Sequence, residues 1–357
     1  SQHRDGESVT IVNTGSVVTA SAVTEAREVL VGRASGVVER LAVDGGKLLG
    51  RVAAHQSWCR AIDTREKPAQ ILTAGDDGLV RIWDASQSWE PGRGSELTLQ
   101  TARQVAFNGD GGKLAAVCVD GSVRVWDTNR GGLLFESALE AAGCSIAWGP
   151  HGLAVLTETG LLSMWTGLDT NSLLRISTEH FDWPRLIAQT SNGEFLVSAG
   201  DDGQVLVRES SSLKLIDKLQ FPRIRFRGFA EIDDDYFVLG GSDGLLCWIR
   251  RTARGMEVDH EMQVQGLQAI RTISRAGGGA QLMVGDPGGN VVALDDRHRP
   301  GLRWQLKGRV RAATMWDGNS GTAVGSKGWV HRLVSGAEGV RARIAERVTS
   351  ASVSSVG

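Results

Sequence analysis

The sequence has few aromatic residues and no long apolar run, and each shortage excludes a class of protein. Only 6% of the 357 residues are aromatic and one is tyrosine, which argues against a nucleic-acid surface made of stacked rings. No eighteen consecutive residues are apolar, so no membrane-spanning helix is predicted. Residues 1–6 lack the apolar run that a signal peptide requires.

Cysteine is also scarce, with four in the chain. Cys59, Cys118, Cys144 and Cys247 each lie in a predicted strand, and none belongs to a Cys-x-x-Cys pair. This pattern predicts buried thiols in a reducing compartment rather than a disulfide framework or a zinc site. A cytoplasmic or nuclear location is therefore expected.

Excess charge of either sign is missing, because the net charge is −2. A protein this close to neutral does not attract polyanions over its whole surface. Any preference for an anionic partner must therefore come from a local cluster of basic side chains.

Glycine, in contrast, is abundant, with 46 residues, and one stretch shows how it is used. Residues 73–84 read as two short strands joined by a tight turn. The corner Asp76-Asp77-Gly78 supplies the positive φ that a hairpin turn needs, and strand-forming residues follow it directly.

The hairpin recurs along the chain, anchored each time on its turn glycine. Neighbouring turn glycines lie 39 to 45 residues apart, which is the period of a propeller built from four-stranded blades. Eight copies predict eight blades, and seven is the alternative if the first or last repeat is not a true blade. The turn glycines are Gly36, Gly78, Gly121, Gly160, Gly203, Gly244, Gly289 and Gly328.

These repeats resemble the WD-repeat family. Trp83-Asp84 and Trp126-Asp127 end two of the third strands, and His55 precedes its hairpin at the family's distance. The resemblance covers nearly the whole chain. It implies an all-β fold, a WD-repeat β-propeller, which acts by binding other proteins.

A regular repeat makes one closed ring the expected organisation. The propeller is expected over residues 16–347, with residues 1–15 as an N-terminal segment and 348–357 as a disordered tail. Within the first segment, Glu7 to Asn13 is expected to act as a closure strand that completes the last blade.

The resemblance also assigns a structural role to several polar residues. In WD-repeat proteins such residues form a buried hydrogen-bond network from loop to hairpin to third strand. The second repeat has all four of them, and the fifth has three, with Arg208 in place of the tryptophan. The expected network residues are His55, Thr73, Asp77 and Trp83 in the second repeat and His180, Ser198 and Asp202 in the fifth.

Later repeats depart from this pattern. In the sixth, Trp248 falls one position early, so it is expected to face the other side of its strand unless a bulge shifts it. The seventh and eighth repeats, around Gly289 and Gly328, have lost the network residues.

Catalysis and metal binding are weakly indicated. His55, Thr73 and Asp77 combine the groups of a hydrolase triad, but no Gly-x-Ser-x-Gly signature accompanies them. The acidic run 233–235 lacks the ligand spacing of a calcium loop, and the histidines form no metal-ligand cluster. We predict no enzyme activity, no cofactor and no metal.

An arginine recurs at the start of the first strand of most repeats, eighteen residues before the turn glycine in four of them. Two interpretations stay open. The guanidiniums form a positive rim on the channel face that binds an acidic or phosphorylated segment, or each pairs with a nearby carboxylate such as Asp76, Asp201 or Asp243. The arginines are Arg60, Arg103, Arg185 and Arg271, with Arg225, Arg227 and Arg311 close to the equivalent positions.

The predicted function is a non-catalytic scaffold in a multi-subunit assembly, with other proteins as partners. Two alternatives remain. An RNA-associated propeller in an RNA-processing complex would place the basic residues on phosphates, although nucleic acid is not favoured. A substrate receptor of a ubiquitin ligase would use Asp295-Asp296-Arg297, which resembles the Asp-x-Arg ending of some family members, with Leu294 where the family has tryptophan.

Overall fold

The computed structural model describes most of the chain between residues 4 and 334. The described residues are 4–5, 7–13, 17–24, 28–42, 47–65, 70–84, 95–98, 102–118, 120–128, 132–169, 172–270, 272–275, 281–295, 298–306, 309–317, 320–325 and 329–334. The expected tail at 348–357 lies outside them.

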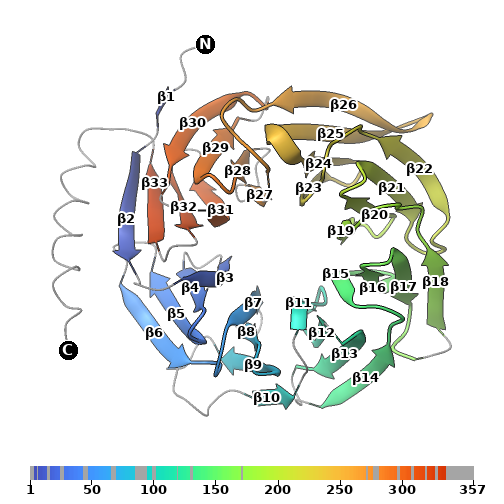
Figure 1. Ribbon diagram of the computed structural model, residues 1–357, viewed down its shortest axis with the longest axis horizontal. Helices are drawn as coiled ribbons and strands as arrows, with labels where there is room; N and C mark the ends of the chain where they lie inside the picture. The colour runs from blue at the N-terminus through green and yellow to red at the C-terminus, as the bar shows by residue number, and fades with distance from the viewer. Residues whose placement is uncertain are drawn as a thin grey trace.

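Strand pairing groups the described strands into eight sheets set side by side around a ring (Figure 1). We number the sheets in chain order; the first strand of each lies nearest the ring axis. Sheet 1 has β3 (Val18–Val23), β4 (Glu28–Arg33), β5 (Val37–Ala42) and β6 (Leu48–Ala53); sheet 2 has β7 (Cys59–Arg65), β8 (Gln70–Gly75), β9 (Leu79–Asp84) and β10 (Ser95–Thr98). Sheet 3 has β11 (Ala102–Phe107), β12 (Lys113–Cys118), β13 (Ser122–Asp127) and β14 (Leu133–Ala138); sheet 4 has β15 (Gly143–Gly149), β16 (Gly152–Thr157), β17 (Leu161–Trp165) and β18 (Leu173–Ser177).

The second half of the ring repeats this order. Sheet 5 has β19 (Pro184–Gln189), β20 (Phe195–Gly200), β21 (Gln204–Glu209) and β22 (Leu215–Gln220); sheet 6 has β23 (Gly228–Asp233), β24 (Tyr236–Gly240), β25 (Leu245–Thr252) and β26 (Gly255–Gln263). Sheet 7 has β27 (Thr272–Arg275), β28 (Leu282–Gly285), β29 (Asn290–Leu294) and β30 (Pro300–Gln305); sheet 8 has β31 (Val310–Asp317), β32 (Ser320–Gly325) and β33 (Trp329–Val334).

Two N-terminal strands join the last two sheets. β2 (Glu7–Asn13) pairs antiparallel with β33, so it is the outermost strand of sheet 8. β1 (Arg4–Asp5) pairs parallel with β30 and adds a fifth strand to sheet 7. The second and the last described strands, β2 and β33, thus meet, and sheet 8 is completed by hydrogen bonds between segments far apart in the sequence.

The core lies between neighbouring sheets. The second strand of a sheet is covered on both faces, as in β20, where all six residues are buried, so its sequence is mostly apolar. The outermost strands alternate instead, as β22 does between partly buried and exposed residues. Because each sheet buries its faces only against its neighbours, the stability of each sheet depends on the stacking.

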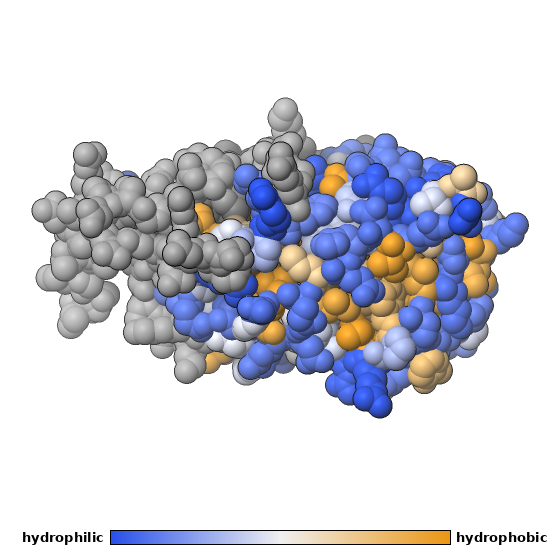
Figure 2. All heavy atoms as spheres, turned by 90° about the horizontal axis from the view of Figure 1, so that it is seen from above, coloured by the Kyte–Doolittle hydropathy of each residue, from blue (hydrophilic) through white to orange (hydrophobic). Residues whose placement is uncertain are grey.

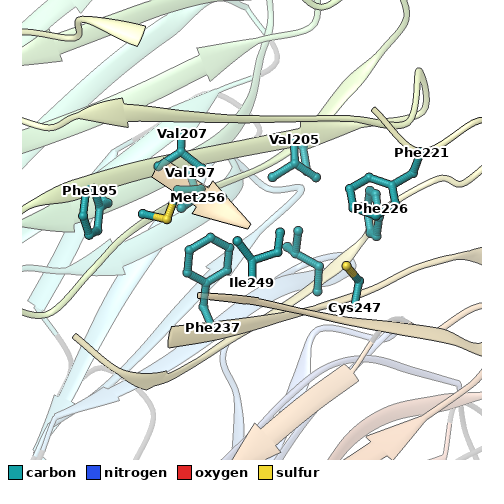
Figure 3. Packing of buried hydrophobic residues seen from close by; sticks show 12 residues of the cluster. Phe195, Val197, Val205, Val207, Phe221, Phe226, Phe237, Cys247, Ile249 and Met256 are labelled. Atoms are coloured by element: carbon teal, nitrogen blue, oxygen red, sulfur yellow. The ribbon is translucent and has the colours of Figure 1, made fainter. Parts of the chain in front are cut away.

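The contact between sheets 5 and 6 illustrates this packing (Figure 3). Phe195 and Val207 from sheet 5 lie with Phe237 and Ile249 from sheet 6 in one buried cluster. Trp248 belongs instead to the cluster that joins sheets 6 and 7. The prediction that it faces the opposite side is therefore confirmed, and the tryptophan is fully buried there.

One face of the ring carries the turns between the second and third strands, and we call it the hairpin face. In sheet 2, Cys59 at the start of β7 pairs with Gly75 at the end of β8. In sheet 5, Pro184 pairs with Gly200 in the same way. The starts of the innermost strands therefore lie on the hairpin face as well.

The cysteines behave as the sequence predicts. All four are free thiols and each lies in a strand, three of them buried and Cys144 partly buried. Burial raises the pKa of Cys59, Cys144 and Cys247 to about 12, so these thiols stay protonated and unreactive at neutral pH. None of the described helical residues forms a segment of the length and hydropathy needed to cross a membrane.

Candidate partner-binding face

Four side chains of sheet 2 form one hydrogen-bonded chain from the loop before β7 to the third strand. Trp83 Nε1 donates to Thr73 Oγ1 at 3.0 Å, and Thr73 Oγ1 lies 3.0 Å from His55 Nε2. His55 Nδ1 lies 2.9 Å from Asp77 Oδ1. The four residues expected to form a network are thus in direct contact.

The direction of each hydrogen bond follows from the residues at the two ends of the network, because the indole only donates and the carboxylate only accepts. Asp77 accepts only, so His55 Nδ1 carries the proton, and its Nε2 accepts the Thr73 hydroxyl. Burial lowers the pKa of His55 and keeps it neutral. Although burial acts to raise the pKa of Asp77, hydrogen bonds from the Gln56 amide and His55 lower it overall. Each of these hydrogen-bonding side-chain atoms of the sheet 2 network has a partner, as buried polar atoms require.

Sheet 5 contains the same arrangement with two replacements, Ser198 for the threonine and Arg208 for the tryptophan. His180 Nδ1 lies 2.9 Å from Asp202 Oδ2, and its Nε2 lies 3.0 Å from Ser198 Oγ. Arg208, at the tryptophan position, is buried and donates from Nη1 to the Leu213 carbonyl at 3.1 Å. Burial lowers the pKa of Arg208.

Sheet 7 lacks the hydroxyl and tryptophan of the network, as the sequence indicates, but one of its aspartates joins the loop to the hairpin. Asp286 is fully buried, and its carboxylate accepts the Gln268 amide from the preceding loop at 2.9 Å and the Asn290 amide of the hairpin at 2.8 Å. Asp286 thus connects the preceding loop to the hairpin, in the same way that Asp77 does by accepting hydrogen bonds from the Gln56 and Leu79 amides. The sequence pattern missed this role because backbone donors replace the histidine.

The sheet 2 network predicts how stability depends on pH. The pKa of His55 is lowered below its ordinary value of 6.5, so the unfolded chain binds more protons once the pH falls below 6.5, and the folded state loses stability. Asp77, with a pKa below 3.8, adds a further loss as the pH falls through and below that value. Urea unfolding midpoints at pH 7.5 and 5.0 test this. We expect a lower midpoint at pH 5.0 and a smaller difference in His55→Asn; an equal difference in that variant would contradict the assignment.

The arginines at the starts of the innermost strands are mostly paired with carboxylates. Arg60 binds Asp76 through Nε and Nη2 at 2.7 and 2.6 Å, and Arg185 binds Asp201 through the same two nitrogens at 3.1 and 3.0 Å. Arg227 also contacts Asp201, at 2.9 Å. These pairs match the second of the two interpretations for the arginines they contain.

Within the described part of the chain, the other arginines of the predicted rim do not share this pairing with a hairpin aspartate. Arg103 pairs with Glu158 of the next sheet. Arg225 is exposed, and no ion pair is found for it among the described residues. Arg271 lies outside the described residues, and Arg311 lies in β31 with a side chain that is not described. Free positive charge is therefore concentrated at fewer positions than the repeating arginines suggest.

Two exposed tryptophans on the hairpin face escaped the sequence analysis. Trp58 is 42% exposed and Trp183 is 49% exposed. The Arg60 guanidinium lies 4.6 Å from the ring centre of Trp58, and that of Arg185 lies 4.5 Å from that of Trp183. The shared pattern His-x-x-Trp-x-Arg, at 55–60 and 180–185, could have revealed them.

Each set therefore consists of an indole, a guanidinium stacked on it and an aspartate that holds the guanidinium. We call them the Trp58 triad (Trp58, Arg60, Asp76) and the Trp183 triad (Trp183, Arg185, Asp201). The pairing fixes each arginine, so the exposed ring face is held in one orientation.

Other sequence candidates have simple structural explanations. The acidic run forms a turn in which the Asp235 amide donates to Asp233 Oδ1 at 3.1 Å. Asp295 pairs with Arg299 at 2.8 Å, whereas residues 296–297 of the suspected docking motif lie outside the described part of the chain. In the described part, no three acidic, histidine or cysteine side chains meet in a way that could hold a metal ion.

Comparison with known sequences matches two of the repeats to a family model. The family model "WD domain, G-beta repeat" matches residues 46–84 and 98–127. Telomerase protein component 1 of Rattus norvegicus is 28% identical over 179 residues, 49% of this chain and 7% of that protein. Gastrulation defective protein 1 homolog of Drosophila melanogaster is 37% identical over 92 residues, and autophagy-related protein 16 of Arabidopsis thaliana is 28% identical over 145. The chain spans less than a third of each of these relatives, at 7%, 14% and 28% of their lengths.

Solved structures share the fold. The computationally designed Ika8 protein superposes with a TM-score of 0.76 at 18% identity, over 93% of this chain and 100% of that one. Chaetomium thermophilum Sqt1, bound to the N-terminus of ribosomal protein L10, superposes with a TM-score of 0.78 at 14% identity, over 92% of this chain and 100% of that one. The family model thus matches two of the repeats, and the sheets and the superpositions show that the chain has a β-propeller fold.

Proposed function

We propose that this chain is a non-catalytic protein-interaction scaffold in a multi-subunit assembly, and that its hairpin face holds an acidic or phosphorylated segment of a partner. WD-repeat propellers generally act through protein contacts. The observation that carries the proposal is the pair of matching triads in sheets 2 and 5, each with an exposed indole and a stacked guanidinium.

Tryptophan and arginine are the residue types that most often dominate binding energy at protein interfaces. Holding them rigid lowers the entropy that a partner must remove on binding. The aspartate in each triad occupies Nε and Nη2 of its arginine, so Nη1 keeps free donors. A carboxylate or phosphate of a partner can bind that remaining edge while its neighbouring residue packs on the indole.

The proposal is tested by affinity capture from a native extract, quantified by mass spectrometry. One variant carries Trp58→Ala and Trp183→Ala, and a second carries Arg60→Glu and Arg185→Glu. The control is Leu133→Ala with Leu134→Ala, which removes exposed apolar side chains from the outermost strand of sheet 3. Each variant must first show native circular dichroism.

We expect both triad variants to lose the same partners by about tenfold or more, the effect of removing one interface hot spot, while the control retains them. Treating the extract with phosphatase distinguishes phosphorylated from acidic segments. If folded triad variants keep every partner of the intact chain, the hairpin face is not the interface and the proposal fails.

We further infer that each of the eight sheets is one blade and that β2 closes the ring. Strand pairing supports this count, because the outermost strand of sheet 8 comes from the N-terminal segment. Electron-microscopy class averages along the ring axis count blades directly. Seven blades in these averages would overturn the inference.

A further inference from the structure

We infer that a groove between sheets 5 and 6, at the outer edge of the hairpin face, is a peptide-binding site of this scaffold. Its occupant is an extended segment of a partner protein in which an apolar side chain stands next to a carboxylate or phosphate. The inference rests on the proposed function and places the anion at a position distinct from both triads.

The groove has a volume of about 480 Å³ and mostly apolar walls. Its lining includes Leu219, Phe221, Pro222, Ile224, Leu245 and Val258. These residues come from the end of β22, the loop after it, the start of β25 and the middle of β26. Figure 2 shows apolar surface, surrounded by polar residues, on the side of the ring where β22 and β26 lie in Figure 1. The volume suits one large apolar side chain of a peptide.

The floor of the groove is rigid. Phe221 packs edge to face on Phe226, with ring centres 5.1 Å apart and an angle of 83° between the rings. Phe226 is fully buried and belongs to the cluster between sheets 5 and 6 (Figure 3). A pre-formed apolar wall of this kind binds a side chain without first having to order itself.

The loop beside the groove holds an arginine in an unfavourable backbone conformation. Phe221 to Ile224 form a tight turn, closed by the Ile224 amide donating to the Phe221 carbonyl at 3.2 Å. Pro222 occupies the second position, and Arg223 the third, with φ of +66°. Glycine normally takes that third position, and a side chain there costs about 1 kcal/mol. The fold alone would be better served by glycine at 223.

The arginines here differ in charge pairing from those of the triads. Arg223 and Arg225 are both exposed, and among the described residues neither forms an ion pair, unlike Arg227, which contacts Asp201. They flank Ile224 of the groove wall. The opposite wall includes Glu261 of β26, which repels a second anion at that end. The charges therefore favour a segment with its acidic residue on the arginine side.

The test uses fluorescein-labelled hexapeptides and the intact chain, with binding followed by fluorescence anisotropy. One set of peptides has Leu or Phe next to Glu or phosphoserine; matched sets have Lys at the acidic position or Ala at the apolar one. We expect the acidic apolar peptides to bind about tenfold or more tightly than either matched set, as loss of a charge-assisted contact or a buried side chain predicts.

Arg223→Gly removes the guanidinium and suits the positive φ, so it is expected to fold at least as well as the natural chain. We expect it to weaken binding about fivefold or more. Val258→Lys, at an exposed position of the lining, is expected to abolish insertion of the apolar side chain. The matched control is Arg254→Gly, an exposed arginine in the turn between β25 and β26 on the opposite face.

The inference is overturned if Arg223→Gly and Val258→Lys bind the peptides as the natural chain does. It is also overturned if a single-stranded RNA probe binds in an Arg223-dependent way while no peptide does. The Trp58→Ala and Trp183→Ala variant separates the two proposals. Peptide binding that this variant retains and that Arg223→Gly then removes is binding in the groove, whereas peptide binding that this variant loses is binding at the triads, so failure of the triads and failure of the groove give different results.

Discussion

Replacing Thr73 with valine is expected to lower the free energy of unfolding by about 2–4 kcal/mol, because two buried polar groups lose their partner at once. Thr73 is fully buried. Its hydroxyl oxygen accepts from Trp83 Nε1 and its proton satisfies His55 Nε2. Valine fills the same volume, so the loss comes from the unpaired indole N–H and imidazole nitrogen rather than from a cavity.

Urea unfolding monitored by tryptophan fluorescence measures the effect. Thr166→Val is the matched control, since that threonine is exposed and donates only a 3.3 Å hydrogen bond to the Ser172 carbonyl. We expect a change below about 0.5 kcal/mol for it. A Thr73→Val variant as stable as the control would show that the network contributes specificity rather than stability.

Gly203→Ala is expected to be at least as damaging, with a loss of about 3 kcal/mol or more. Gly203 has φ of +71°, where a side chain already costs about 1–2 kcal/mol. An added Cβ would also lie against the Phe221 carbonyl oxygen and 3.0 Å from that of Ile224. Both atoms are backbone and cannot move without distorting the turn beside the groove.

Gly121→Ala separates the cost of the positive φ from the cost of the steric contact. Gly121 occupies the equivalent turn position in sheet 3 with φ of +80°, but its Cβ would meet backbone oxygens only at 3.3 and 3.4 Å. We expect it to cost about 1–2 kcal/mol, the conformational term alone. Equal losses in the two variants would mean that the backbone at 221–224 yields to the added methyl group.

The fold could be predicted because its determinants are local and repeat. A positive φ at each turn demands glycine, and strands of period two on either side of it fix the hairpin. The polar network was also within reach of the sequence, since His55 and His180 stand at the same interval from their hydroxyl partners. Trp248 shows that a shift of one position was enough to predict that it faces the other side of its strand.

The charge state of the hairpin face could not be predicted in the same way. The pairs of Arg60 with Asp76 and of Arg185 with Asp201 lie within one sheet and match one of the two interpretations of the sequence, whereas other pairs join groups from two different sheets. Arg103 reaches Glu158 of sheet 4, and Asp201 serves both Arg185 and Arg227. Asp286 escaped for a related reason, since it accepts from the backbone amides of Gln268 and Asn290 and from the Asn290 side chain rather than from a histidine.

The pairing of β2 with β33 has a consequence for how the protein is made. A ribosome releases β2 before the strands of sheets 1 to 8, and β33, the strand that completes its hydrogen bonding, emerges after all the other described strands. Until β33 emerges, the nascent chain therefore presents an unpaired strand edge and an incomplete sheet, the kind of exposed segment that promotes aggregation. A chain cut short before β33 would leave an open arc rather than a smaller ring.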